Sequence, residues 1–322
     1  MARILTGVQS TGTPHLGNII GAVLPAIEMA KNEQNQSFLF IADFHSLTQI
    51  KDKSTLRKNT FETASTWLAF GLNPNKTIFY KQSDVSEVTE LAWYLSCFFP
   101  FKRLTLAHSF KDKSANLKDI NTGLFSYPML MAADILLYDA DIVPVGKDQL
   151  QHIEMTRDVA SRFNNTYGET LIVPSSLIDT SIKFVPGTDG NKMSKSKNNL
   201  INVFLEKEKL KKQIMGIKTD SKNINEPKDF SSCTIFNLYK ILAEKKDIEK
   251  LKNKYSKGNI GYGEAKQLLF ELILNKFKHA REKFTYFQNN PEKVELALSQ
   301  GAVKAQKIAQ KTLKRVRAKL GY

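Results

Sequence analysis

The fold of this chain is decided by the stretch ARILTGVQSTGTPHLGNIIGAVLPAIEMAKNEQNQSFLFIADF, residues 2–44. It begins with a segment of strand length, Arg3 to Gln9, and a glycine-rich turn then leads into a stretch of helical length, Leu16 to Lys31. The apolar run Gln36 to Phe44 has the composition of a buried strand. A strand, a helix and a second strand in this order predict two parallel strands joined by a crossover helix.

The same alternation continues to about residue 173. Further strands are predicted at Thr77–Lys81, Asp141–Val145 and Leu171–Val173, and further helices at Ser54–Phe70, Val85–Cys97, Tyr127–Tyr138 and Gln149–Phe163. Apolar strands that alternate with helices predict an α/β fold with a parallel sheet covered on both faces. Ligands in such folds bind at the carboxyl ends of the strands, where the strand order reverses.

The second part of the chain has a different pattern. From about Phe204 the strands disappear, and lysine-rich helical patterns continue to the end, broken by the loop Asn223–Asp229. We therefore predict an α/β domain over residues 1–203 and a helical domain over residues 204–322. The last predicted helix, Ala302–Leu320, has one apolar face and a basic remainder without an acid. This pattern is typical of a packed helix with a solvated basic face, and direct contact with RNA is the alternative.

Composition excludes several kinds of site. The 322 residues are 42% hydrophobic and 25% charged, as in ordinary globular proteins. The two isolated cysteines, Cys97 and Cys233, cannot build a four-thiolate zinc or iron–sulfur site, and we expect no bound metal. The amino-terminus lacks a signal-peptide pattern, and the longest apolar stretch contains three aspartates, so we expect a soluble, cytoplasmic protein. The net charge of +15 indicates a nucleic-acid partner or biased codon usage.

A glycine-rich turn, GVQSTGTPHLGN at residues 7–18, directly follows the first predicted strand. Its glycines allow the backbone to approach a ligand, and the start of the next helix presents unpaired amides to an anion. His15 and Asn18 lie on one turn of that helix start, where both side chains can reach phosphate oxygens. The glycine spacing differs from the dinucleotide-binding pattern, so a nicotinamide cofactor is not predicted.

A second motif, KMSKS at residues 192–196, follows the polar loop 187–191. Two lysines and two hydroxyls on one loop can clamp a polyphosphate while its charge redistributes. A solvated lysine loop is the alternative interpretation in so basic a chain. The presence of both motifs in one sequence is more specific than either motif alone.

A third pattern lies on the helix predicted at Tyr127–Tyr138. Tyr127, Met131, Asp134 and Tyr138 are spaced by four, three and four residues, so they share one face. Asp134 lies in an apolar run, where a carboxylate needs a partner. That partner is either the indole N–H of a ligand, which can only donate, or a group of the protein itself, such as a backbone amide or a lysine.

The first two motifs together resemble the HIGH-type and KMSKS signatures of class I aminoacyl-tRNA synthetases. Within that class, Tyr127–Tyr138 and Asp141–His152 resemble the tryptophanyl-tRNA synthetases of bacterial type, and the similarity extends over Thr6–Tyr167. The resemblance implies a Rossmann-like catalytic domain over residues 1–203. It also implies a tRNA-anticodon-binding helical domain over residues 204–322, whose last helix can pack back on the catalytic domain.

The same resemblance implies a tryptophan–tRNA ligase that works as a cytoplasmic homodimer. Its substrates are L-tryptophan, ATP with Mg²⁺ bound through the ATP, and tRNA(Trp); membrane and DNA partners are not expected. The tryptophan carboxylate attacks the α-phosphorus of ATP, and pyrophosphate leaves. The 2′-hydroxyl of the terminal tRNA adenosine then attacks the acyl group of the tryptophanyl-adenylate.

Family roles carry over by position. The residues implied to contact ATP are Gln9, Ser10, Thr11, His15, Gly17, Asn18, Gly146, Lys147, Asp148, Ile182, Lys192, Met193, Ser194, Lys195 and Ser196. The residues implied to hold tryptophan are Gln9, His45, Tyr127, Met131, Asp134, Val143, Val145 and Gln149, with Asp134 accepting the indole N–H. Lys113, Lys192 and Lys195 are the implied catalytic lysines, which stabilise the phosphates in the transition state.

The sequence departs from the family at three points. His15 stands where many bacterial relatives carry threonine, Leu5 replaces an aromatic residue, and the segment before KMSKS differs in length. Three other functions remain as alternatives. Met131 and Asp134 disfavour a tyrosyl-tRNA synthetase, the intact KMSKS lysines disfavour a tryptophan- or nucleotide-sensing paralogue, and the helical domain disfavours a tRNA-independent adenylyltransferase.

Overall fold

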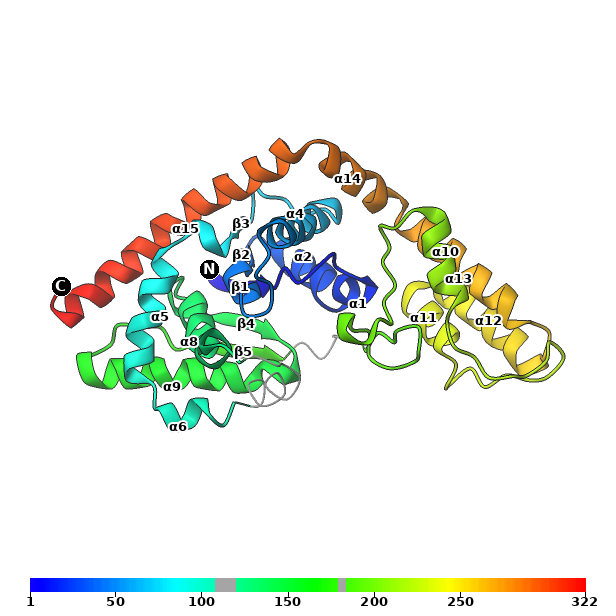
Figure 1. Cartoon of the computed structure of the whole chain (residues 1–322), viewed down its shortest axis with the longest axis horizontal. Helices are drawn as coiled ribbons and strands as arrows, with labels where there is room; N and C mark the ends of the chain where they lie inside the picture. Colours follow the sequence, from blue (N-terminus) through cyan, green and yellow to red (C-terminus); the bar gives the residue numbers. More distant parts are fainter. Residues whose placement is uncertain (108–119, 179–183) are drawn as a thin grey trace.

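The computed structural model describes residues 1–107, 120–178 and 184–322. Within these ranges a parallel sheet of five strands, in the order β3-β2-β1-β4-β5, forms the centre of the first domain (Figure 1). The strands are β1 (Ala2–Val8), β2 (Asn35–Ile41), β3 (Ile78–Lys81), β4 (Ile142–Val145) and β5 (Ser175–Ile178). The predicted α/β fold is confirmed.

The strand order reverses at β1. From β1 the chain continues to β2 and β3 on one side, and it then returns to β4 on the other side of β1. β1 pairs with β2 along its whole length, but it is in register with β4 at a single pair, Ile4↔Ile142. Because the connecting segments leave β1 and β4 toward opposite sides, a crevice forms at the carboxyl ends of these two strands.

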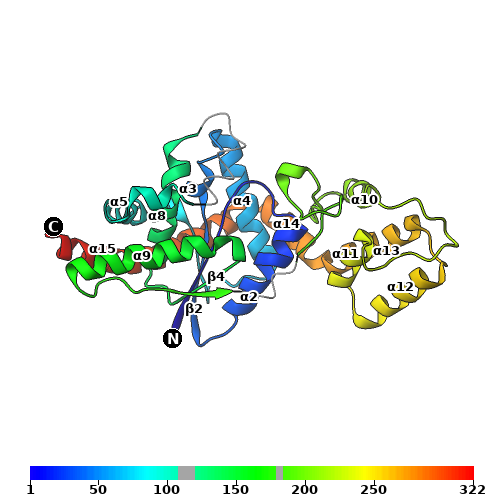
Figure 2. The same ribbon diagram turned by 90° about the horizontal axis from the view of Figure 1, so that it is seen from below.

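Helices cover both faces of the sheet (Figure 2). One face carries α2 (Leu24–Ala30) and α4 (Lys53–Ala69), and the other carries α5 (Glu87–Phe98), α8 (Thr122–Leu136) and α9 (Leu150–Tyr167). Each face of the sheet carries its own apolar core, and alternate residues of β2 point into one core or the other. Phe38 and Phe40 pack with α5 and α8, whereas Leu39 and Ile41 pack with α2 and α4. The continuous apolar run of β2 thus reflects a strand that is buried on both faces.

Two helices differ from their predicted limits. The helix predicted at Leu16–Lys31 is divided into α1 (Leu16–Asn18), a π-helical turn (Ile19–Val23) and α2. α8 begins before the predicted Tyr127, where Asn121 caps it by accepting the N–H of Leu124.

The strand predicted at Leu171–Val173 is wrong, because the fifth strand begins only at Ser175. The side chain of Asn164 forms hydrogen bonds with backbone groups of Thr170 and Leu171 that a strand would use for pairing. Its Oδ1 accepts the N–H groups of Thr170 and Leu171 at 3.1 and 2.9 Å, and its Nδ2 donates to the carbonyl of Leu171 at 2.8 Å. Leu171 is buried as a core residue of this loop, and strand pairing starts after Pro174.

The helical part of the chain forms its own apolar core. Its helices are α10 (Lys207–Met215), α11 (Thr234–Leu242), α12 (Lys245–Lys257) and α13 (Tyr262–Lys276), and the next helix, α14 (Lys278–Asn289), packs on α4 of the sheet domain. Their core also includes Met193, Ile201, Leu16 and Ile19, so the bundle is joined to the start of the first helix and to the KMSKS segment. The exact division at residues 203 and 204 remains a prediction.

The last helix, α15 (Pro291–Leu320), leaves this bundle and packs along the sheet domain (Figure 1). It begins well before the predicted Ala302, and Ala305, Ala309 and Val316 on its inner face are wholly buried. Two of its arginines form ion pairs with the sheet domain, the half-buried Arg315 with Asp139 and the exposed Arg317 with Glu90. None of the helices in the described ranges combines the length and apolar character that a membrane crossing requires.

Gly301 is the closest point between α15 and the sheet. A Cβ atom at this position would lie 1.8 Å from the carbonyl oxygen of Phe79 in β3. We expect Gly301→Ala to lower the free energy of unfolding by about 1–3 kcal/mol, as overpacking does, although alanine normally favours a helix over glycine. Urea unfolding of the two proteins measures this difference.

Gly263 in α13 is the matched control, because a Cβ atom there meets nothing within 4 Å. Gly263→Ala should leave the unfolding free energy unchanged or raise it by up to about 1 kcal/mol. Equal stability of Gly301→Ala and the wild type would contradict the close packing of α15 on β3.

Candidate active site

A cavity of about 450 Å³ opens at the carboxyl ends of β1 and β4. The structure brings all eight predicted amino-acid-binding residues to its wall, namely Gln9, His45, Tyr127, Met131, Asp134, Val143, Val145 and Gln149. Leu5 of β1 and Gly146 after β4 also line it. These residues come from four separate parts of the sequence, and the strand reversal at β1 brings them together. Their contacts with a ligand remain a prediction.

Asp134 is the acidic side chain on this wall, and it is only 3% exposed. His45 donates through Nε2 to Oδ2 at 2.8 Å, and Gln82 donates through Nε2 to Oδ1 and Oδ2 at 2.7 and 2.9 Å. Burial raises the pKa of Asp134, while the hydrogen bonds from His45 and Gln82 act in the opposite direction. Among the described residues, the hydrogen-bond partners of this carboxylate are therefore a histidine and a glutamine, and no backbone amide or lysine bonds to it.

Gln82 was not among the residues predicted from the sequence. The available signal was its position, because it directly follows β3 at the same edge of the sheet as the ends of β1 and β4. Polar residues at such strand ends are candidates for a site in this type of fold.

A second chain of hydrogen bonds orients Tyr127 and Gln149. Gln149 donates through Nε2 to Asp148, so its Oε1 faces His152 Nδ1, at 2.9 Å, and that nitrogen carries the proton. His152 Nε2 then accepts the hydroxyl of Tyr127 at 2.8 Å. His152 is 1% exposed and fixes both cavity side chains from behind. The sequence had placed it in a family motif without giving it a role.

The glycine-rich turn ends in a capped helix start. His15 Nδ1 accepts the N–H of Asn18 at 3.3 Å, and Asn18 Oδ1 accepts the N–H of His15 at 3.2 Å. Burial, and then the charge of Lys195, lower the pKa of His15 to about 4, so the imidazole is neutral at pH 7. In this state His15 and Asn18 hold the helix start, and their contacts with ATP remain a prediction.

The hydroxyl of Ser10 is engaged in hydrogen bonds within the protein. It is wholly buried, and its hydroxyl is hydrogen-bonded to the hydroxyls of Ser46 and Thr60, each at 3.1 Å. Its predicted ATP contact is not tested, but these bonds show what the hydroxyl does in the free protein. It ties the glycine-rich turn to the segment after β2 and to α4.

The KMSKS segment docks on the glycine-rich turn. Met193 Sδ accepts the N–H of Gly17 at 3.4 Å, and Lys195 Nζ donates to Thr11 Oγ1 at 3.5 Å, although these pairs are 176 and 184 positions apart. A side chain at Gly12, whose φ is +139°, would meet Lys195 Nζ at 3.0 Å. Burial lowers the pKa of Lys195 to about 8. Lys192 is exposed, so the two lysines have different environments.

Asn199 is 2% exposed, and its side chain forms hydrogen bonds with the KMSKS loop and the polar loop before it. Its Oδ1 accepts the N–H of Ser194 at 2.8 Å, and its Nδ2 donates to Asp189 Oδ1 at 2.6 Å and to the carbonyl of Lys192 at 3.1 Å. Nothing in the sequence distinguished this asparagine from others in a chain rich in asparagine. Its role depends on the folded loop.

Some predicted residues cannot be placed. Lys113 and Ile182 lie outside the described residues, and so do the side chains of Lys147 and Ser196. Cys97 and Cys233 are free cysteines. In the described ranges, no three His, Cys, Asp or Glu side chains come together as a metal site would require.

Comparison with known proteins assigns the family. Residues 1–278 match the family model described as tRNA synthetases class I (W and Y). The tryptophan–tRNA ligase of Campylobacter jejuni (strain RM1221) is 44% identical over 319 residues, which cover 99% of each chain. The chain belongs to the tryptophan–tRNA ligase family.

A relative from a second organism and a solved structure support this assignment. The enzyme of Fusobacterium nucleatum is 46% identical over 325 residues, covering 100% of this chain and 98% of its own. A crystal structure of tryptophanyl-tRNA synthetase from Campylobacter jejuni, complexed with ADP and tryptophan, matches with a TM-score of 0.94 and covers 99% of this chain and 100% of its own. The resemblance that the two motifs indicated is thus confirmed at the level of the family.

Substitution of Asn199 tests whether its side chain fixes the conformation of the KMSKS loop. We expect Asn199→Ala to speed the hydrogen exchange of the Ser194 amide about ten-fold or more, because that amide loses its acceptor and the loop loses two further bonds. Hydrogen–deuterium exchange with peptide resolution measures this change.

Asn191→Ala is the matched control on the same loop. Asn191 is exposed, and its side chain donates only to Asp189 among the described contacts. Its substitution should leave the exchange of Ser194 close to that of the wild type. Equal acceleration in both variants would show that Asn199 has no special part in holding the loop.

Proposed function

We propose that this chain activates L-tryptophan with ATP and then transfers it to the 3′ end of tRNA(Trp). The observation that carries the proposal is a buried carboxylate, Asp134, on the wall of a largely apolar cavity. Gln9 also lines this cavity and lies two residues before Thr11, to which Lys195 of the KMSKS segment donates. The family membership and the ADP and tryptophan bound to the Campylobacter jejuni relative support it.

The cavity explains the choice of amino acid. Met131, Val143 and Val145 provide an apolar wall, and Asp134 provides an acceptor for an N–H group. Phenylalanine has no donor in its ring and leaves this acceptor position unpaired. Tyrosine carries an O–H on a single, smaller ring, which places its donor differently from an indole N–H. A site built around such a hydrogen bond can reject the wrong substrate by roughly 10⁴–10⁵.

The chemistry of the first step needs positioning and charge, and no side chain acts as a nucleophile. Lys195 and Lys192 stabilise the negative charge that develops on the phosphates as pyrophosphate leaves. Mg²⁺ enters with ATP and neutralises the phosphates further. Lys195 is already held at the glycine-rich turn in the free protein, so little reorganisation is needed when ATP binds.

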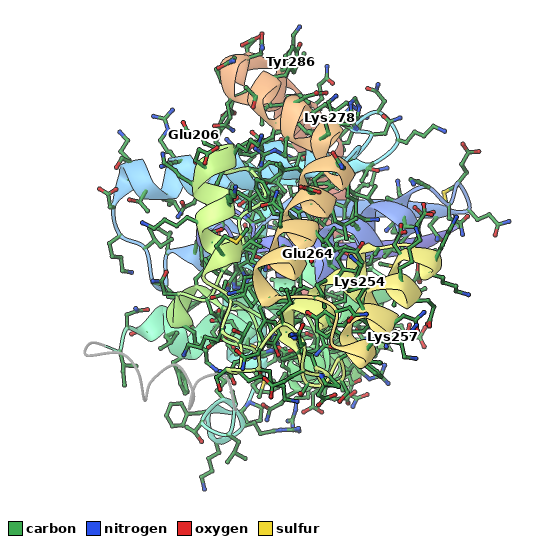
Figure 3. The ribbon with its side chains drawn as sticks, turned by 90° about the vertical axis from the view of Figure 1, so that its right-hand side faces the viewer. Glu206, Lys254, Lys257, Glu264, Lys278 and Tyr286 are labelled. Atoms are coloured by element: carbon green, nitrogen blue, oxygen red, sulfur yellow. The ribbon has the colours of Figure 1, made fainter. Side chains whose placement is uncertain are left out.

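The helical domain is the proposed contact surface for tRNA. Figure 3 shows its outer face, with Lys254 and Lys257 on α12, Glu264 on α13, and Lys278 and Tyr286 on α14. Lys254 forms an ion pair with Glu264 at 2.8 Å, whereas Lys257 and Lys278 are exposed and Tyr286 is 50% exposed. Exposed lysines suit phosphates, and an exposed aromatic ring suits an unstacked base.

An apolar surface supports the proposal of a homodimer. Trp93 on α5, Phe101 on α6 (Phe101–Leu104) and Leu106 are 69%, 69% and 58% exposed. These exposed side chains all lie within residues 87–106, and large exposed apolar side chains of this kind are typical of a protein–protein contact. We place the homodimer in the cytoplasm, where tRNA is charged for translation.

Pyrophosphate exchange into ATP tests the function most directly. We expect exchange with tryptophan and none above background with tyrosine or phenylalanine, because neither carries an N–H at the position of the indole nitrogen. Exchange with tyrosine would overturn the proposed specificity and leave the activation chemistry intact. Protein that binds tryptophan but shows no exchange would instead be the sensor paralogue.

The pKa of Lys195, about 8, predicts a pH dependence. The lysine is charged below this pH, so kcat/KM for ATP should fall as the pH rises through about 8. Lys195→Arg should have a lower rate but keep its charge, so the fall near pH 8 should disappear. Pyrophosphate exchange at saturating tryptophan measures the profile, and a fall that persists in Lys195→Arg would assign it to another group.

A further inference from the structure

Gln82 has a fixed orientation in the core of the sheet domain. It is 1% exposed and lies in the short 3₁₀ helix Gln82–Asp84, directly after β3. Its Oε1 accepts the N–H of Phe44 at 3.1 Å. Because a backbone N–H can only donate, this bond turns the amide nitrogen of Gln82 toward Asp134.

The bonds from Gln82 fix both oxygens of the Asp134 carboxylate. Gln82 Nε2 lies 2.7 Å from Oδ1 and 2.9 Å from Oδ2, and His45 adds one bond to Oδ2. An ionised carboxylate has about four acceptor positions, so these three contacts leave about one for a ligand. Gln82 itself does not line the cavity, whereas His45 and Asp134 do.

We propose that Gln82 is a positioning residue, which sets the plane of the Asp134 carboxylate from behind the cavity wall and leaves one acceptor position for the indole N–H of the substrate. This inference rests on the proposed function. Gln82 touches no substrate atom, so it acts only through Asp134. A neutral amide suits the task, because it stabilises the ionised carboxylate and brings no charge of its own.

Other titratable groups also face Asp134. Asp43 and His45 come from α3 (Asp43–Ser46), Tyr80 comes from β3, and Tyr138 follows α8. Burial and the charge of Asp43 both raise the pKa of Asp134, whereas His45 and Gln82 lower it. Removal of Gln82 therefore takes away one of two groups that keep the carboxylate ionised.

The test replaces Gln82 by methionine, which has a similar length and no donor. The readout compares tryptophan with 3-(3-benzothienyl)-L-alanine, in which sulfur replaces the indole N–H. In pyrophosphate exchange, Gln82→Met should reduce the wild-type preference for tryptophan over this analogue about ten-fold, because only tryptophan uses the carboxylate. The KM for ATP should stay close to that of the wild type.

The pH profile is the second readout. Substrate recognition requires the ionised form of Asp134, so kcat/KM for tryptophan falls as the pH drops through its pKa. Because Gln82→Met removes a donor to that form, the fall should begin about one pH unit higher than in the wild type. Gln82→Glu keeps an acceptor for Phe44 N–H and places a second carboxyl beside Asp134. The two cannot both ionise easily, so this variant should also shift the fall upward.

Ser83→Ala is the matched control in the same 3₁₀ helix. Ser83 donates to Asp43, and no described contact joins it to Asp134. Its substitution should leave the preference for tryptophan unchanged. Equal losses with both substrates in Gln82→Met, or an unshifted pH profile in both Gln82 variants, would overturn the positioning role. Absence of tryptophan-dependent exchange in the wild type would instead overturn the proposed function.

Discussion

The placement of β1 between two parallel neighbours is the constraint on which the rest of the structure depends. β2 and β4 lie on opposite sides of β1, so the segments that follow β1 and β4 leave the sheet toward different sides. Neither of these segments fills the crevice between the carboxyl ends of β1 and β4, and the cavity opens there. Gln9 at the end of β1 and Gly146 at the end of β4 meet across it, although 137 residues of the sequence separate them.

Two later parts of the chain complete this arrangement. The KMSKS segment returns to the glycine-rich turn and places Lys195 at Thr11, and α15 returns to the edge strand β3. Both returns have a physical cost. Burial of Lys195 lowers its pKa, and the approach of α15 to β3 admits only glycine at position 301. The result is that the amine of Lys195 is already held at the glycine-rich turn in the free protein, and preorganised charge of this kind is an efficient source of catalysis.

The elements and the site could be predicted to different extents. Buried parallel strands have a strong pattern, so β1 to β4 were found, and helical spacing correctly placed Tyr127, Met131 and Asp134 on one face that meets the cavity. The fifth strand was missed because the side chain of Asn164 holds Leu171 in a loop, and such a bond is not visible in a pattern of apolar residues. Gln82, His152 and Asn199 were missed for the same reason. Each is a polar residue whose role is fixed by a partner distant in sequence or by a folded loop.

The partners of Asp134 show why such a role is difficult to predict. An isolated acid in an apolar run suggests a cationic partner, because a buried charge is costly without one. An arginine could bind both carboxylate oxygens and neutralise the charge, but it would then leave little attraction for a substrate N–H. Gln82 also contacts both oxygens and remains neutral, so the carboxylate keeps its charge and an acceptor position. A site that recognises one neutral N–H group is therefore better served by amide donors, which a sequence does not distinguish from ordinary core polar residues.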